Sequence, residues 1–403
     1  MFLPHFGIED MGLDIAIIGG GVAGLSLLCY LQLTLPHLKV QVFEKDEEFN
    51  NRGQGYSLTI QQGKTLLRKL QIETQCREKS GVISVGYDRI NASDGDKILQ
   101  RGAKRSKKIT EKNKKFSNFP IARQELREIV LQKIINSENE ELNLIQWGHA
   151  LDRFEVSEDE LLQVFFKNGK EIKTKSIIGC DGLRSVVRNI ILNDPLVYSG
   201  KLMINGITET TNKRFFHRVF EVVDGTNRVF IKPFSMAANS NTQKTMWQLT
   251  FDEDEEVAKR LATNSDVEKL SILLEIAKER TKDYLEPVRD LIHSTAVNTM
   301  RGGPLYDRDP IPIECVDNWH LPVTLLGDAA HPMTPFKGQG ANTAMTDILE
   351  MVDCLQKGLQ EGKSYSQIFR EYEKKMIPRA TLKQQASRQI TMDTHTDSAL
   401  SKE

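Results

Sequence analysis

The amino-acid sequence predicts an α/β fold in which a parallel sheet carries an inserted antiparallel sheet and a long C-terminal helix. Three observations support this prediction. A buried-strand pattern, a glycine cluster and a helix pattern follow one another near the start of the 403-residue chain. Residues 201–252 alternate between apolar and polar side chains, which is typical of strands. Residues 364–390 have the periodicity of a helix.

The first predicted unit is a strand, a helix and a second strand. Residues 13–18 (LDIAII) form a continuous apolar run, typical of a strand that is buried on both faces of a parallel sheet. Residues 22–35 are expected to form a helix that ends before Pro36, because proline cannot continue a helix. Residues 38–43 (LKVQVF) are the second strand. A β-α-β unit therefore opens the fold.

Later segments extend both sheets. Residues 123–135 predict a helix, residues 161–166 followed by Asn168-Gly169 predict a hairpin, and residues 175–179 predict a buried strand. Asp224-Gly225 is a hairpin turn within the 201–252 block. Residues 254–292 predict amphipathic helix, 323–326 a short strand and 341–358 a helix. The segment 97–115 holds nine basic residues and one acidic residue and is expected to be a solvated loop.

Composition narrows the function classes. Hydrophobic residues make up 39% and charged residues 27%, as in an ordinary globular protein, and the net charge of −1 gives no reason to expect a nucleic-acid partner. The five cysteines are scattered, with no CxxC pair, which disfavours a disulfide framework or a zinc site and favours the cytoplasm. No stretch approaches the roughly 20 apolar residues of a membrane span. We expect no metal site and no membrane span.

The glycine cluster has the spacing of a dinucleotide-binding turn. In Gly19-Gly20-Gly21-Val22-Ala23-Gly24, Gly19 permits the tight turn, Gly21 lets the backbone approach a pyrophosphate and Gly24 allows close packing of helix and strand. Glu44 closes the second strand, 20 residues after Gly24, where an acid suits the hydroxyls of an adenosine ribose. A glycine-rich turn without a ligand remains the alternative.

Two further motifs indicate the cofactor. Asp181-Gly182 follows a buried strand, and Gly327-Asp328 leads through His331 to the segment 338–342 (GQGAN) at the start of a helix. With the glycine turn, these motifs cover nearly the whole chain and resemble the group A flavoprotein monooxygenases, the family of para-hydroxybenzoate hydroxylase and kynurenine monooxygenase. The resemblance implies a Rossmann-like FAD-binding domain of the GR2 type.

The resemblance also implies domain boundaries. The FAD-binding domain is expected to be discontinuous, over residues 13–80, 119–198 and 296–360. The substrate-binding sheet domain takes residues 81–118 and 199–295, and the C-terminal helix takes residues 361–395. Residues 1–12 and 396–403 are expected to be tails.

Particular residues inherit roles from the resemblance. Asp328 is expected to accept hydrogen bonds from the ribityl chain of FAD, although a turn residue is the alternative. Gly338, Gly340, Ala341 and Asn342 are expected to present backbone N–H groups to the pyrimidine end of the flavin, where a helix N-terminus stabilises negative charge. Asp181 is expected near FAD and the NAD(P)H route, or in a turn. His331 is expected to be structural.

Within the family the sequence is most similar to the tetracycline-inactivating monooxygenases. Glu44-Lys45, Arg52 and residues 56–60 (YSLTI) match the segment that follows their second strand. There, an arginine at the position of Arg52 is associated with NADPH, and an acid at the position of Thr59 touches FAD, so the threonine here departs from the pattern. Two further groups of positions match: Arg123 lies where an arginine meets the flavin or on the helix surface, and Asn205 and Arg228 lie where substrate contacts occur or on solvated strands.

The predicted activity follows from this resemblance. FAD is expected to be reduced by NADPH or NADH, to form a C4a-hydroperoxide with O₂, and to hydroxylate an aromatic or enolic, polyketide-like small molecule. The cofactor carries this chemistry, so no catalytic side chain is assigned. A flavin-dependent halogenase is one alternative, but its Trp-x-Trp signature is missing, because Trp147, Trp247 and Trp319 are far apart. A non-catalytic FAD-binding redox protein is the other. The protein is expected to be a monomer or homodimer.

Overall fold

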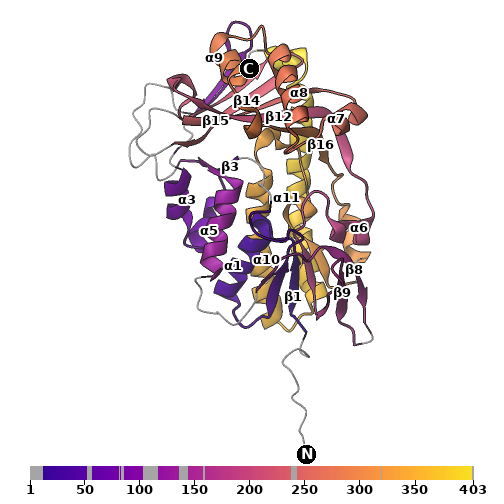
Figure 1. The fold of residues 1–403 in the computed structure, drawn as a ribbon. Helices are drawn as coiled ribbons and strands as arrows, with labels where there is room; N and C mark the ends of the chain where they lie inside the picture. Colours follow the sequence, from indigo (N-terminus) through magenta and orange to yellow (C-terminus); the bar gives the residue numbers. More distant parts are fainter. Residues whose placement is uncertain are drawn as a thin grey trace, which may run out of the picture.

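Two large sheets, joined by long helices, form the body of the protein (Figure 1). The computed structural model describes residues 12–51, 57–80, 82, 86–102, 117–135, 144–157, 159–236, 243–318 and 320–401. The first sheet has five parallel strands and the second has seven strands, which are mostly antiparallel. The mixed α/β architecture agrees with the predicted FAD-binding, Rossmann-like fold. Among the described residues, none of the helices is both long and apolar enough for a transmembrane segment.

The five-stranded sheet is assembled from distant parts of the chain. Its order is β17-β11-β1-β2-β7, and every neighbouring pair is parallel. The strands are β1 (Ile15–Ile18), β2 (Val40–Phe43), β7 (Ile145–Gln146), β11 (Ile177–Gly179) and β17 (Val323–Leu325). Because β1 is central, the glycine turn that follows it lies between the turns that follow β2 and β11.

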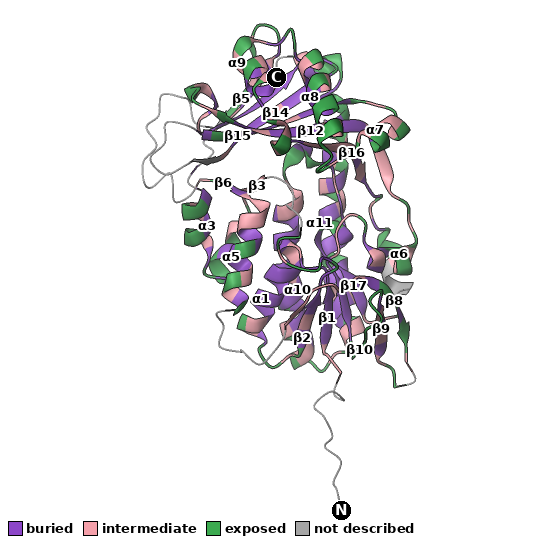
Figure 2. Ribbon diagram, in the orientation of Figure 1, coloured by how far each residue is buried: buried purple, intermediate pink, exposed green. Residues whose placement is uncertain are grey.

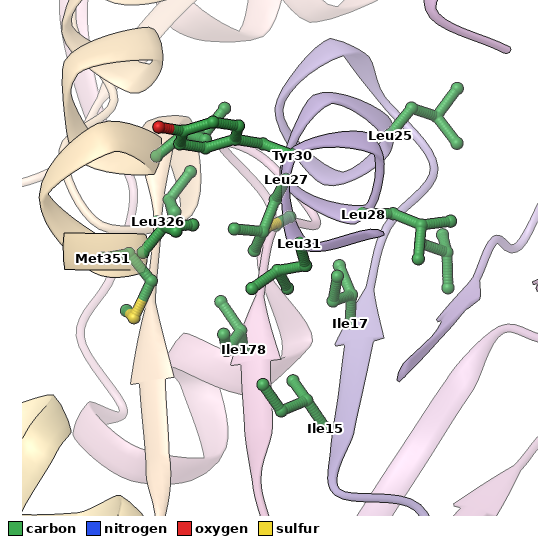
Figure 3. Close-up of a cluster of buried hydrophobic side chains, with 14 of the residues drawn as sticks. Ile15, Ile17, Leu25, Leu27, Leu28, Tyr30, Leu31, Ile178, Leu326 and Met351 are labelled. Carbon is green, nitrogen blue, oxygen red and sulfur yellow. The ribbon is translucent and has the colours of Figure 1, made fainter. Parts of the chain in front are cut away.

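The helix α1 (Val22–Thr34) packs against this sheet. Figure 3 shows side chains of α1, among them Leu27 and Leu31, facing Ile15 and Ile17 of β1 and Ile178 of β11. The helix also contacts α5 (Arg123–Ile135) and α10 (Gly340–Gln360), so it is buried on several sides. The apolar run of α1 therefore belongs to the core, and the first β-α-β unit is confirmed.

The seven-stranded sheet lies above the carboxyl ends of the parallel strands (Figure 1). Its order is β16-β12-β15-β14-β13-β4-β5, and the turn at Asp224-Gly225 joins β13 to β14 as predicted. The strands are β4 (Gly86–Asn91), β5 (Lys97–Gly102), β12 (Val197–Thr210), β13 (Arg218–Val223), β14 (Arg228–Met236), β15 (Gln243–Asp252) and β16 (Arg301–Asp307).

The two faces of this sheet differ in chemistry. One face presents apolar side chains such as Val229, Ile231 and Trp247 to α8 (Val267–Arg280) and α9 (Glu286–His293), and it forms a second hydrophobic core. The other face presents Arg228 and Lys232 toward the parallel-sheet domain, because strand residues two apart share a face. Figure 2 shows that this sheet is largely buried although one of its faces is polar.

Smaller elements connect the two sheets. Strands β3 (Ser57–Ile60) and β6 (Phe119–Ala122) form an antiparallel pair beneath the seven-stranded sheet, and α11 (Tyr365–Asp393) runs along α10 toward the same sheet (Figure 1). The predicted hairpin at Asn168-Gly169 joins β9 to β10. The remaining elements are α2 (Lys64–Lys69), α3 (Glu73–Ser80), β8 (Leu151–Val156), β9 (Leu162–Phe166), β10 (Glu171–Thr174), α6 (Val186–Leu192) and α7 (Glu255–Leu261).

The structure differs from the sequence predictions at four places. Residues 254–292 form three helices rather than one, because Asp266 caps the start of α8 and Pro287 lies at the start of α9. Residues 97–102 are strand β5 rather than a solvated loop, and residues 103–116 lie outside the described part. Strand β16 joins the seven-stranded sheet beyond the predicted boundary at residue 295. Ala399, in the predicted tail, is buried against Ile98.

Candidate functional site

The glycine turn after β1 is closed at its back and open in front. Gly19 has a φ of +111°, and a Cβ there would lie 2.6 Å from the carbonyl oxygen of Cys180. A Cβ on Gly24 would lie 1.9 Å from the carbonyl oxygen of Gly19, so helix and turn touch. At Gly21 the nearest atom is Nη2 of Arg123, 3.8 Å away. Of these three glycines, Gly21 is therefore the one at which a ligand such as a pyrophosphate can come close to the protein backbone.

Two cavities adjoin at this turn. One, of about 260 Å³, extends toward Glu44 and Lys45, and the other, of about 110 Å³, extends toward Asp328 and Ala341. Both are lined by Gly21, Arg123, Cys180 and Gly182. Together they form an elongated cleft along the carboxyl ends of the parallel strands, which is where such sheets bind nucleotides.

Glu44 marks one end of the cleft. Its buried carboxylate accepts hydrogen bonds from the backbone N–H groups of Gly20, at 2.6 Å, and Asp46, at 3.0 Å. These bonds fix the carboxylate beside the turn, and Glu44 lines the cavity there. Lys45 is exposed at the same end.

Two arginines of α5 flank the glycine turn. Arg123 is half-buried and lines both cavities, and the structure records no hydrogen bond or ion pair for it within the described ranges. Arg127, one helical turn later, is fully buried and donates from Nε to the carbonyl oxygen of Gly20 at 2.8 Å. Arg127 therefore holds the turn in place, whereas Arg123 offers its charge to the cleft.

Asp328 marks the other half of the cleft. Its side chain is exposed between two buried neighbours, and its Oδ1 lies 3.4 Å from the position of a Cβ on Gly340. No other described residue is recorded as a hydrogen-bond partner of this carboxylate. It is thus directed into the cleft beside the start of α10.

A buried ion cluster holds the Asp328 loop. Asp347 of α10 accepts a hydrogen bond from the N–H of Gly327 at 3.1 Å, contacts Nε2 of His331 at 2.6 Å and accepts from Arg379 at 2.7 Å. Burial alone raises the pKa of Asp347, but His331 and Arg379 outweigh it and the net direction is downward. Burial alone lowers the pKa of His331, but Asp347 outweighs it and the net direction is upward. His331 is structural, as the sequence predicted.

The start of α10 faces the same cavity. Its N-cap Gln339 makes no side-chain cap, and its first turn has no acidic residue, so the helix presents free N–H groups around Gly340 and Ala341. Gly338 has a φ of +59° and open space beside it. Asn342 is buried, and its amide donates to the carbonyl oxygen of Thr59 at 2.8 Å.

The Asn342 side chain also accepts hydrogen bonds from the N–H groups of Gln61, at 2.8 Å, and Gly63, at 3.1 Å. Its amide oxygen and nitrogen therefore fasten β3 to α10. The predicted contact with the flavin consequently rests on the backbone of Asn342.

Asp181 combines a cavity position with a structural role. Its Oδ2 accepts from the N–H groups of Val186 and Val187 at 2.7 and 3.3 Å, so it caps α6, in agreement with the turn alternative. Its Oδ1 is buried without a recorded partner, and burial raises the pKa of this carboxyl above its ordinary value. Nearby, Arg188 donates to the carbonyl oxygen of Ala330, which joins the Asp181 and Asp328 loops.

The predicted substrate residues lie on the polar face of the seven-stranded sheet. Asn205 and Arg228 are 3% and 2% exposed, so the alternative of solvated strand residues is wrong. Arg228 donates from Nε to Glu221 at 2.6 Å, and its guanidinium lies 4.5 Å from the ring of Phe336, just before Gly338. The Oδ1 of Asn205 is buried and has no recorded partner among the residues that the structure describes.

The structure brings together most of the predicted cofactor residues. Arg52 lies outside the described residues. Sequence reasoning missed Arg127, whose position four residues after Arg123 could have indicated it, since such residues share a helix face. It also missed Glu221 and Lys232, because Arg89, a partner of Glu221, and Ser57, a partner of Lys232, are distant in sequence.

The cleft fits FAD on observations of this structure. The exposed carboxylate of Asp328 and the guanidinium of Arg123, neither of which has a recorded partner in the described part of the chain, line it, and Gly21 leaves room for a pyrophosphate. Two helices, α1 and α10, start at it without side-chain caps or acidic first turns, and such N-termini favour phosphate and other anionic groups.

Comparisons with known proteins support this assignment. A family described as an FAD binding domain matches residues 317–387. The monooxygenase cfoF of Aspergillus candidus is 25% identical over 96% of this chain and 92% of its own length. The 3-amino-4-hydroxybenzoate 2-monooxygenase of Streptomyces cremeus is 24% identical over 96% and 89%. The protein is an FAD-dependent monooxygenase of the aromatic-hydroxylase type.

A solved structure shows the same fold as this monooxygenase. Klebsiella pneumoniae HpxO, in complex with FAD and uric acid, aligns with a TM-score of 0.75 at 20% identity and covers 97% of this chain and 91% of its own. The two proteins therefore share the arrangement of a parallel sheet, an inserted sheet and a C-terminal helix.

Proposed function

We propose that this monooxygenase consumes NADH or NADPH and O₂ to hydroxylate an aromatic or enolic small molecule, bound between the seven-stranded sheet and the start of α10. The single observation that carries the proposal is the elongated cleft between Glu44 and Asp328, which reaches Leu58 of β3, the strand beneath the seven-stranded sheet (Figure 1). The relatives that are named as monooxygenases over nearly the whole chain support oxygen insertion.

Bound FAD would supply the hydride acceptance and oxygen activation that side chains lack. Glu44 would hold the adenosine ribose, Gly21 and Arg123 the pyrophosphate, and Asp328 the ribityl chain. The N–H groups around Gly340 would face the pyrimidine end, where their partial positive charge favours negative charge. Lys45, Thr59 and Asp181 are proposed as lesser contacts.

The sheet would bind the substrate and exclude water. Asn205 has a buried acceptor available, and Arg228 lies against Phe336 next to the flavin loop. An aromatic or enolic ring with hydroxyl groups could accept a hydrogen bond from Arg228, donate one to Asn205 and pack against Phe336. Polyketide-like compounds are one part of this substrate class. Four further points stay predictions: the closeness to the tetracycline-inactivating enzymes, the use of Arg52 for NAD(P)H, the monomer or homodimer state, and a cytoplasmic location.

The test starts with the purified protein. It should be yellow, and acid precipitation should release FAD into the supernatant, since the predicted contacts are non-covalent. Phenolic and enolic compounds should then be screened for faster NAD(P)H consumption and for a product that is heavier by one oxygen atom. Bound FAD with no substrate-stimulated consumption would favour a redox protein, and a halogenated product would favour a halogenase.

A further inference from the structure

Lys232 on β14 is a buried lysine that has no counterion among the described residues. It is 4% exposed, and no described carboxylate lies within ion-pair distance of its ammonium group. Its Nζ donates to the carbonyl oxygen of Ser57 at 2.6 Å and to Oγ1 of Thr59 at 3.4 Å. The buried Lys201 of the same sheet, in contrast, has such a partner in Asp252. A buried charge without a counterion is costly, so this position requires an explanation.

The contacts of Lys232 lead to the flavin end of the cleft. Thr59, which accepts from Lys232, also accepts from Asn342 through its carbonyl oxygen, and Asn342 lies in the first turn of α10. One strand, β3, therefore separates the lysine from the N-terminus of α10. The path from the Lys232 ammonium group to the start of α10 consists of the hydrogen bond to Thr59, Thr59 itself and its hydrogen bond to Asn342. Its length places the positive charge within roughly 10 Å of the helix start.

The carboxylate on the sheet face of Lys232 is already paired with arginines. On the same sheet face, Glu221 is bonded to Arg89 and Arg228. Strands β3 and β6 carry no charged side chain. The other ionisable groups on elements that contact β14 are Glu73, Cys76, Arg77, Glu78 and Lys79 of α3, Arg218 of β13, Lys244 and Asp252 of β15, and Lys213 and Arg214 beside β13. Burial alone lowers the pKa of Lys232 to about 7.

We propose that Lys232 is a positioning residue that places an ionisable positive charge behind the pyrimidine end of bound FAD and thereby favours the reduced, anionic cofactor. The inference rests on the proposed function. NAD(P)H delivers two electrons and one proton as a hydride, so neutral FAD gains one negative charge on reduction. Lys232 exchanges its own proton with solvent and takes no part in the hydride transfer.

The expected size of the effect follows from Coulomb's law. A charge about 10 Å away at an effective dielectric constant near 20 changes the reduction equilibrium by roughly tenfold. For a two-electron couple, tenfold corresponds to about 30 mV in midpoint potential. The contribution is present when Lys232 is protonated, below about pH 7, and is lost as the pH rises.

The experiment is a redox titration of the holoenzyme with dithionite and reference dyes, at pH 6 and pH 9. Lys232→Met removes the charge, Lys232→Arg keeps it at both pH values, and Lys201→Met is the matched control on the same sheet. Wild-type enzyme should match Lys232→Arg at pH 6 and Lys232→Met at pH 9. At pH 6, the equilibrium constant for reduction of FAD should be about tenfold lower in Lys232→Met than in wild type.

Two results would overturn the proposal. In the first, the midpoint potentials of wild type and Lys232→Arg differ by the same amount at pH 6 and pH 9. In the second, Lys232→Met shifts the midpoint potential relative to wild type by the same amount at both pH values. If Lys232→Met does not retain FAD, the wild-type and Lys232→Arg comparison still decides, because only wild type should change its pH slope near pH 7. No nicotinamide or substrate is present, so failure here is distinct from failure of the proposed hydroxylation.

Discussion

Replacement of Asp328 by asparagine tests the cofactor cleft most directly. The carboxylate is exposed and has no recorded partner among the described residues, so Asp328→Asn breaks no internal contact. With FAD bound, it would remove one charge-assisted hydrogen bond, which is worth about 1.5–3 kcal/mol. We therefore expect a 10- to 150-fold higher Kd for FAD. The free energy of unfolding of the apoprotein should change by less than about 0.5 kcal/mol.

The assay is a titration of apoprotein with FAD, followed by the quenching of flavin fluorescence. Asp353→Asn is the matched control. Asp353 is an exposed residue of α10, the helix that starts at the cleft, and it lies about 20 Å from that start along the helix axis. The control should bind FAD as wild type does. A folded Asp328→Asn protein with a Kd within twofold of wild type would remove Asp328 from the binding site and refute the reasoning.

Three further perturbations have distinct expected outcomes. Gly21→Ala should fold but lose FAD, whereas Gly24→Ala should fail to fold, because only the second methyl group meets backbone; circular dichroism and FAD content separate them. Arg123→Gln should weaken FAD binding about tenfold without a change in Tm, and an unchanged affinity would make it a surface arginine. Asp347→Asn should destabilise the protein by about 3–5 kcal/mol in urea, because it leaves buried His331 without its partner. The lowered pKa of Asp347 means that wild type loses this stabilisation as the pH falls below about 4.

The sequence indicated the cofactor half of the protein well, for a physical reason. A glycine turn, a buried strand and an acid must follow one another at fixed spacing to bind a dinucleotide, so local pattern and function coincide. The cleft accordingly contains Gly21, Glu44 and Arg123. Asp328 is assigned through the resemblance of its Gly-Asp motif to the flavoprotein monooxygenases, and it does line the cleft.

The other roles and elements could not be predicted from the sequence, because they depend on contacts between segments that are distant in the chain. The structure assigns Asp181 to the cap of α6 and the Asn342 side chain to β3, and neither bond follows from spacing. Strand β5 looked like a solvated loop because basic residues dominate its sequence, yet β4 supplies a pairing edge. Lys232 read as one polar residue of an alternating strand, since its lack of a carboxylate is visible only in three dimensions.

The strand order of the parallel sheet also has a consequence for synthesis on the ribosome. Strand β11, one neighbour of β1, follows β1 by some 160 residues, and β17 follows about 145 residues after that. The glycine turn thus waits for most of the polypeptide before its supporting loops exist. Although β2 can pair with one edge of β1 early, the other edge of this apolar strand meanwhile lacks its partner, which exposes the nascent chain to aggregation. Slow translation or loss of chaperones should therefore reduce the yield of this enzyme more than that of a protein whose neighbouring strands are consecutive.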